Sequence, residues 1–157
     1  MALVVFVDRL EGILSKTDRI AKITFRGLAQ FTKVHEANEA TSGFLDFNEK
    51  LEWPLASGIL PTEVLEIQIY HVNKLFSNKI YGSFRMILQQ LVRDGQLAVM
   101  ETLLDGNNTS LESKIYIRIE YQAPDGTVGS WKTEQFGRHQ VVEDSIPLIE
   151  QQTTPDR

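Results

Sequence analysis

The segment Ile115-Tyr116-Ile117-Arg118-Ile119-Glu120-Tyr121 sets residues 115, 117, 119 and 121 against the more polar residues 116, 118 and 120. The same period-two alternation occurs in Ile20–Phe25 and in Leu65–Tyr70. This period is typical of a β-strand that buries one face and exposes the other. Because one-sided burial is characteristic of antiparallel sheets, these segments predict an all-β, antiparallel protein.

Five further segments favour strands, namely residues 2–7, 28–33, 47–53, 80–84 and 99–104. Eight short strands separated by polar turns predict a sandwich of two sheets, whose strand order stays open. Residues 86–93 depart from the period-two alternation, because Leu88, Leu91 and Val92 recur at helical spacing and Gly95 follows as a helix-terminating residue. We expect a short helix there, within a loop that crosses between the sheets.

The chain has 157 residues, no cysteine and a net charge of -5. Without cysteine there are no disulfides, thiolate metal ligands or thiol nucleophiles, and the acidic balance argues against nucleic acid as a partner. Residues 1–122 carry the alternation and predict one domain. Residues 123–157 carry isolated apolar residues among Pro, Gly, Gln and Thr, and predict a largely disordered linker or tail. With no long apolar segment or leader, a cytoplasmic domain is expected.

The residues give little support for catalysis or for a resident metal. His35, His71 and His139 are scattered without the spacing of a zinc site. The chain has no nucleophile elbow, metalloprotease helix motif or glycine-rich phosphate loop. We therefore expect a non-catalytic protein without a cofactor.

Three segments carry a resemblance to a known family. Phe47–Trp53 resembles the W-N-E-x-F-x-F strand of C2 domains, and Thr17–Ile23 is similar to the S-D-P-Y-V-x-V segment that follows their first loop. Asn78–Gly82 resembles the N-D-x-I-G sequence that closes their third loop. The resemblance implies an eight-stranded antiparallel C2 β-sandwich.

Longer segments are similar to the N-terminal C2 domain of ferlins: Asp18–Lys22, Thr24–Gly27, Val64–Ile69, Phe76–Lys79, Gly82–Met86 and Tyr121–Gly129. The resemblance runs from Met1 to about Trp131. It implies a large parent protein anchored in a vesicle or plasma membrane, with many C2 domains. Such a protein acts in exocytosis and synaptic-vesicle fusion, and this module would face the cytoplasm. Its implied partners are other domains of the same protein or vesicle-fusion proteins.

The C2 resemblance also places a calcium site at the first and third loops, where a hard cation needs many oxygen ligands. Asp18 stands at a matching ligand position, and the leading aspartate would fall near Gly12 or Ile13. On the third loop the expected aspartates are His71, Asn73 and Lys79. Asn73 offers one neutral oxygen, whereas the Lys79 ammonium repels a cation. Asp8 and Glu11 could supply the missing carboxylates only if the first loop folded back over the site. We therefore expect a degenerate site that binds no calcium.

These features leave two functional interpretations of the apical loops. The first is a calcium-independent module that contacts proteins or neighbouring domains. The alternative is a weak binder of anionic phospholipid, through the candidate contact residues Lys16, Arg19, Val72, Lys74, Leu75 and Phe76, with Lys79 beside them. Asp8, Glu11 and Asp18 at the same end offset most of that positive charge.

Two further arrangements are open at this stage. Leu75 and Phe76 could instead pack against the short first loop. A second basic surface, formed by Lys22, Arg26, Lys33 and Lys50 on outward strand faces, is another candidate for acidic lipid or protein.

Overall fold

The computed structural model describes residues 1–12, 17–36 and 43–123. The predicted tail therefore lies outside the described residues, apart from Ala123. All eight predicted strands are confirmed. They are β1 (Ala2–Glu11), β2 (Arg19–Phe25), β3 (Leu28–Phe31), β4 (Phe44–Pro54), β5 (Val64–His71), β6 (Lys79–Ile87), β7 (Gln96–Leu104) and β8 (Ser110–Gln122).

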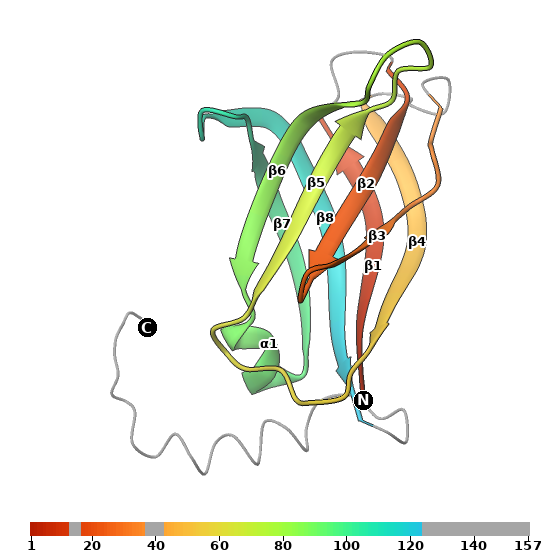
Figure 1. Ribbon diagram of the computed structural model, residues 1–157. Helices are drawn as coiled ribbons and strands as arrows, with labels where there is room; N and C mark the ends of the chain where they lie inside the picture. The colour runs from red at the N-terminus through yellow and green to blue at the C-terminus, as the bar shows by residue number, and fades with distance from the viewer. Residues whose placement is uncertain (13–16, 37–42, 124–157) are drawn as a thin grey trace.

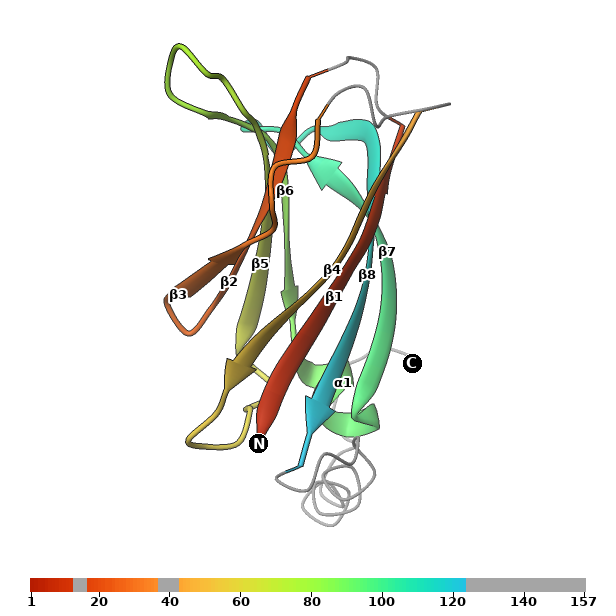
Figure 2. The same ribbon diagram turned by 90° about the vertical axis from the view of Figure 1, so that its right-hand side faces the viewer.

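The strands are hydrogen-bonded in the order β3-β2-β5-β6-β7-β8-β1-β4, and every pairing is antiparallel. Strands β6 and β7 meet through the pair Ser83 and Leu104, and the sheet folds over there into two layers. One layer is β3-β2-β5-β6, and the other is β7-β8-β1-β4 (Figures 1 and 2). The predicted sandwich is confirmed, and the strand order that the sequence left open is now defined.

The crossover between β6 and β7 contains the short helix α1 (Gln89–Asp94). The predicted helix began three residues too early, because Met86 and Ile87 continue β6. Its predicted apolar face is confirmed, since Leu88, Leu91 and Val92 are buried. Gly95 ends the helix in the left-handed conformation, and its N–H donates to the Leu91 carbonyl.

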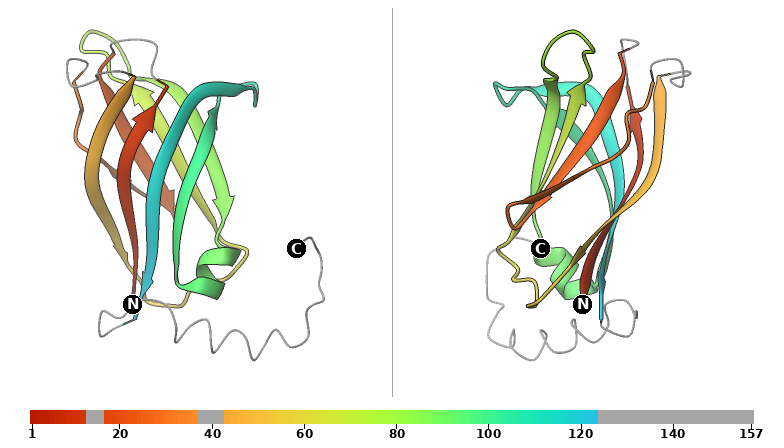
Figure 3. Two further views of the ribbon diagram at one scale, coloured as in Figure 1. Left: turned by 180° about the vertical axis from the view of Figure 1, so that it is seen from behind. Right: turned by 45° about the vertical axis from the view of Figure 1, so that its right-hand side comes forward.

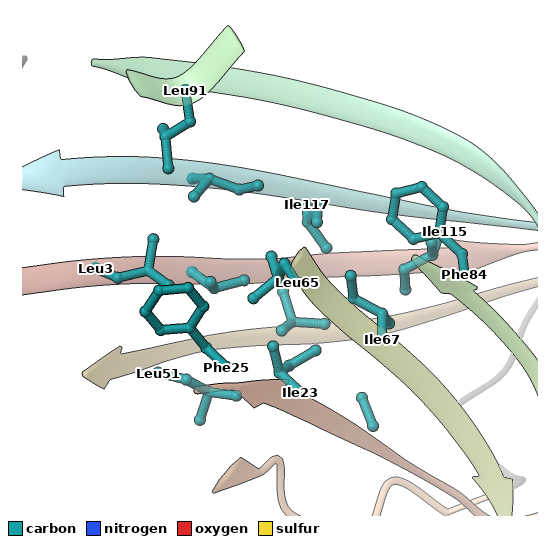
Figure 4. Packing of buried hydrophobic residues seen from close by; sticks show 14 of the residues in the cluster. Leu3, Ile23, Phe25, Leu51, Leu65, Ile67, Phe84, Leu91, Ile115 and Ile117 are labelled. Atoms are coloured by element: carbon teal, nitrogen blue, oxygen red, sulfur yellow. The ribbon is translucent and has the colours of Figure 1, made fainter. Parts of the chain in front are cut away.

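The core lies between the two layers and is built from the inward half of each alternating strand (Figure 4). Ile23 and Ile67 from one layer and Ile117 from the other are at most 1% exposed. Trp53 and Tyr121 also join the core, and each uses its polar end: the indole N–H donates to the Leu28 carbonyl, and the Tyr121 hydroxyl accepts the Ile59 N–H. These bonds let large side chains be buried without an unsatisfied polar group.

The strand directions divide the molecule into two ends (Figure 3). The basal end holds the N-terminus, the end of β8 and α1. The apical end holds the finish of β1 and β5 and the start of β2, β4 and β6. The loop between β5 and β6, residues 72–78, is called the third loop below.

Candidate functional site

Four residues far apart in the sequence form a row across the apical end. Arg19 on β2 is the register partner of His71 on β5, and His71 is in turn the partner of Lys79 on β6. His35 extends the row by an isolated bridge to Arg19. The row thus places two permanent cations and two imidazoles side by side, and none of its members carries a carboxylate.

Arg19 is fully buried, so it does not form part of an exposed lipid-binding surface as the sequence suggested. Its Nη1 donates to the Thr17 carbonyl at 2.8 Å, and its guanidinium lies 5.3 Å from the Tyr81 ring centre. Burial lowers the pKa of Arg19 from its ordinary value, but a guanidinium stays charged in proteins. Arg19 therefore holds a positive charge beneath the apical surface.

The inward direction of Arg19 follows from the alternation. It precedes Ala21, Ile23 and Phe25 at period two, and all three are buried. The sequence therefore contained the signal, which the charge of the side chain obscured.

His71 is partly buried beside this charge. Its ring lies 4.9 Å from the Tyr81 ring. Burial lowers the pKa of His71, and the positive charge of Arg19 lowers it further. Both effects favour the neutral form of His71.

A β-bulge brings Tyr81 into this cluster. Ile69 is opposite Gly82 and Tyr70 is opposite Ile80, which leaves Tyr81 as the extra residue. Bulges re-aim side chains near sites, and here the ring turns toward His71 and Arg19. The Tyr81 hydroxyl bonds to Ser113 on β8, which joins the two layers at this end.

The third loop is shaped by two asparagines. Asn73 Oδ1 accepts the N–H groups of Leu75 at 2.9 Å and of Phe76 at 3.2 Å. The Asn73 N–H donates to Asn78 Oδ1 at 3.0 Å. Both lone pairs of the Asn73 oxygen are thus used inside the loop. The sequence offered this oxygen as a calcium ligand, whereas the structure leaves Asn73 with its amide NH₂ as a donor.

The tip of the third loop is apolar and exposed. Leu75 is 85% exposed and Phe76 is 74% exposed. The alternative in which they pack against the first loop is therefore wrong. Lys74 is also exposed, whereas Val72 is partly buried and donates its N–H to the Asp18 carbonyl at 2.8 Å. Lys16, the remaining candidate contact residue, lies outside the described residues.

An open hollow of about 350 Å³ lies between the third loop and β6. Its described lining consists of Thr17, His71, Val72, Asn73, Lys79, Ile80 and Tyr81. The polar side chains of these residues carry an ammonium, an imidazole, an amide and two hydroxyls, of which that of Tyr81 bonds to Ser113. Asp18 is not among the lining residues.

Of the other calcium-ligand candidates, Ile13 lies outside the described residues, and Gly12, Asp8 and Glu11 are blocked or engaged. Gly12 has a φ of +73°, and a Cβ there would lie 2.5 Å from the Glu112 carbonyl oxygen. Asp8 forms a two-bond ion pair with Arg118, with both distances 3.0 Å, and Glu11 pairs with Arg9 at 2.7 Å. Among residues 1–12, 17–36 and 43–123, no group of three or more His, Asp or Glu side chains is placed to hold a metal ion.

The second basic surface proposed from the sequence is not one surface. Lys22 lies on the outward face of β2, in the first layer, whereas Lys50 lies on β4, in the second. Arg26 is paired with Glu63 at 2.7 Å and donates to the Ser57 and Gly58 carbonyls. These cations are therefore spread over different faces.

Mouse Fer-1-like protein 4 is among the known proteins whose sequences are similar to this chain. The chain is 34% identical over 150 residues to mouse Fer-1-like protein 4. The match covers 95% of this chain but only 7% of that protein, so the chain spans a small part of its relative. No protein-family model matches the chain.

Solved C2 domains share the fold. The C2A domain of plant Extended Synaptotagmin 1 is 18% identical with a TM-score of 0.61, and the match covers 78% of this chain and 96% of that one. The C2A and C2B domains of Extended Synaptotagmin 2 are 17% identical with a TM-score of 0.61, and the match covers 76% of this chain and 40% of that one. Human GIVD cytosolic phospholipase A2 is 16% identical with a TM-score of 0.58. The match covers 76% of this chain but 17% of that one, so the likeness is confined to a minor part of the phospholipase chain.

The chain has the C2 fold, as the sequence resemblance predicted, and its sequence is similar to a short part of Fer-1-like protein 4. Within the described residues no helix is long and apolar enough to cross a bilayer.

Proposed function

We propose that this ferlin-like C2 domain is a non-catalytic, calcium-independent module that docks on anionic phospholipid membranes through its third loop. The observation that supports it is the exposed pair Leu75 and Phe76 at the loop tip, with Lys74 beside it and Lys79 at its base. Of the two interpretations the sequence left open, this geometry favours the membrane over a protein partner.

The energies fit a weak contact. Full burial of a Leu or Phe side chain stabilises by about 1.5–3 kcal/mol, and each basic group near an anionic leaflet adds about 1 kcal/mol. Leu75, Phe76, Lys74 and Lys79 together would supply roughly 5–8 kcal/mol before losses. Ordering the loop and restricting the domain offset part of this. A dissociation constant of roughly 0.1–1 mM suits one module among several in a chain.

Calcium independence is supported by how the ligand positions are used. The Asn73 oxygen holds the loop tip, Lys79 brings an ammonium, and Gly12 has no room for a side chain. A calcium ion takes about six to eight oxygen ligands, and the described apical end offers few unengaged ones.

The parent protein is inferred from likeness alone. Because the quoted segments resemble the amino-terminal C2A domain of otoferlin, we infer that this module is an N-terminal C2 domain of an otoferlin-type ferlin. The parent would be membrane-anchored and active in vesicle fusion, with the module facing the cytoplasm. In such a parent, other domains of the same chain or vesicle-fusion proteins would be further partners beside the membrane.

Co-sedimentation with vesicles tests the membrane proposal. The full chain, in a calcium chelator, should bind vesicles of phosphatidylcholine with phosphatidylserine and leave vesicles of phosphatidylcholine alone mostly unbound. L75A/F76A should lose most of this binding. L60A/I87A is a matched control, because Leu60 and Ile87 are 61% and 59% exposed but lie toward the basal end. Equal binding by both variants would contradict the proposal and favour protein contacts.

A further inference from the structure

We propose that the hollow between the third loop and β6 is a binding site for a phosphate group. The proposal deepens the membrane function proposed above, because it names the chemical group that this end recognises. If the phosphate belongs to a lipid headgroup, the proposal rests on that membrane function. If the phosphate is a free ion, the proposal does not depend on membrane binding.

The hydrogen-bonding groups of the hollow are mainly donors. Lys79 contributes three N–H donors and no acceptor. Asn73 contributes its amide NH₂, since its oxygen accepts the Leu75 and Phe76 N–H groups. His71 and the hydroxyl of Thr17 complete the polar lining. A site rich in donors matches an anion with several acceptor oxygens, which is the chemistry of phosphate.

The electrostatics point the same way. Arg19 is buried, with its guanidinium 5.3 Å from the centre of the Tyr81 ring, and is the strand neighbour of His71. Its charge adds to that of Lys79 at the opposite side of His71. None of the described lining residues carries a carboxylate. The exposed Lys79 ammonium and the buried Arg19 charge would both repel a cation and attract an anion here.

Size and position also fit a headgroup phosphate. The hollow, at about 350 Å³, equals roughly ten water molecules in volume. That leaves room for a phosphate with part of the group that carries it. Asn73 and Val72 line the hollow and belong to the loop that carries Leu75 and Phe76. A tip inserted among lipids would therefore bring the hollow to the level of the phosphates.

Two lysines allow a matched test. Lys79, the first residue of β6, lines the hollow, whereas Lys74, on the adjoining third loop and also exposed, does not. Each substitution by Gln removes one positive charge from the apical end. A general charge effect would make K79Q and K74Q equal, and a defined site would separate them.

The first experiment titrates the full chain with inorganic phosphate at constant ionic strength, with chloride as the reference, and follows backbone amide shifts by NMR. We expect saturable shifts centred on Asn73, Lys79 and Tyr81. K79Q should weaken the affinity about tenfold or more, because it removes a charge-assisted bond, while K74Q should change it less than twofold. Shifts that do not saturate, or that match those in chloride, would overturn the proposal.

The second arm asks where the phosphate comes from. Vesicles of phosphatidylcholine with phosphatidic acid present the same group on a lipid. If K79Q binds them several-fold more weakly than K74Q, the headgroup occupies the site. If the two bind alike while free phosphate still separates them, the site serves a soluble phosphate. Vesicle binding that depends on Leu75 and Phe76 but is accompanied by no phosphate binding would sink this inference and leave the membrane function standing.

Discussion

Three glycines allow the apical geometry to be tested by one chemical change, the addition of a methyl group. Gly12 has a φ of +73°, and its added Cβ would meet the Glu112 carbonyl oxygen at 2.5 Å. Gly27 has a similar φ of +75° with nothing within 4 Å. Gly106 has open space and no left-handed φ. The three positions therefore separate backbone strain from steric overlap.

The expected free energies of unfolding follow from these contacts. G106A should be neutral or stabilise by up to about 1 kcal/mol, because alanine restricts the unfolded chain. G27A should destabilise by about 0.5–1 kcal/mol, since the left-handed conformation costs about 1–2 kcal/mol and the unfolded-state effect offsets part of it. G12A adds an overlap with backbone that cannot rotate away, worth about 1–3 kcal/mol more. Its total should be about 1.5–4 kcal/mol.

Urea denaturation of the full chain, followed by far-UV circular dichroism, measures all three. The order G12A, then G27A, then G106A in loss of stability is the expected result. If G12A is no costlier than G27A, the backbone just after β1 does not approach β8 as closely as the structure shows. The explanation of why an aspartate cannot stand at Gly12 would then fail.

Three further predictions concern the core, the basal ion pair and the calcium site. L51A and I67A should each lower the free energy of unfolding by about 2–5 kcal/mol, and K22A should lower it by less than about 0.5 kcal/mol. Urea denaturation midpoints measure these changes. If K22A is the costlier change, the buried and exposed faces of the strands are reversed. The hydrogen bond from Arg26 lowers the pKa of Glu63 below its ordinary value of 4.5. Ionised Glu63 therefore stabilises the fold above pH 4.5, and this stabilisation is lost as the pH falls through the pKa of Glu63 in the folded state. E63Q should therefore flatten the acid side of the stability curve, and an unchanged curve would show that the pair contributes nothing. The wild type should show no calorimetric binding at submillimolar calcium, where a hundredfold excess over Kd would add about 2.7 kcal/mol of stability. H71D/N73D/K79D should be less stable without metal and partly rescued by millimolar calcium; no rescue would mean that these positions do not converge.

Much of the fold was predictable because burial imposes a period on the strands. The alternation at Ile115–Tyr121 and Leu65–Tyr70 predicted which residues enter the core, and the structure confirms both faces. The helix start was misplaced because Met86 and Ile87 satisfy a helical pattern and a strand pattern equally well. Pairing of Ile87 with Val64, which is a long-range contact, decided between them.

The candidate site was predictable in position but not in chemistry. The C2 resemblance placed His71, Asn73 and Lys79 at one end, and the structure places all three around one hollow. That Asn73 Oδ1 is used within its own loop was signalled by the tendency of asparagine to bond the backbone two residues on. The inward turn of Tyr81 could not be foreseen, because it depends on a bulge defined by the register of two strands.

The central claim is that the tip of the third loop enters an anionic membrane without calcium. It is tested most directly by measuring how deeply the loop tip inserts into the bilayer. The chain has no cysteine, so F76C and L60C each give a single site for a nitroxide label. With vesicles containing phosphatidylserine and a calcium chelator, the label at position 76 should become more accessible to oxygen and less accessible to a polar nickel complex. The label at position 60 should stay exposed to both. A label at position 76 that remains in water on bound vesicles would contradict the account.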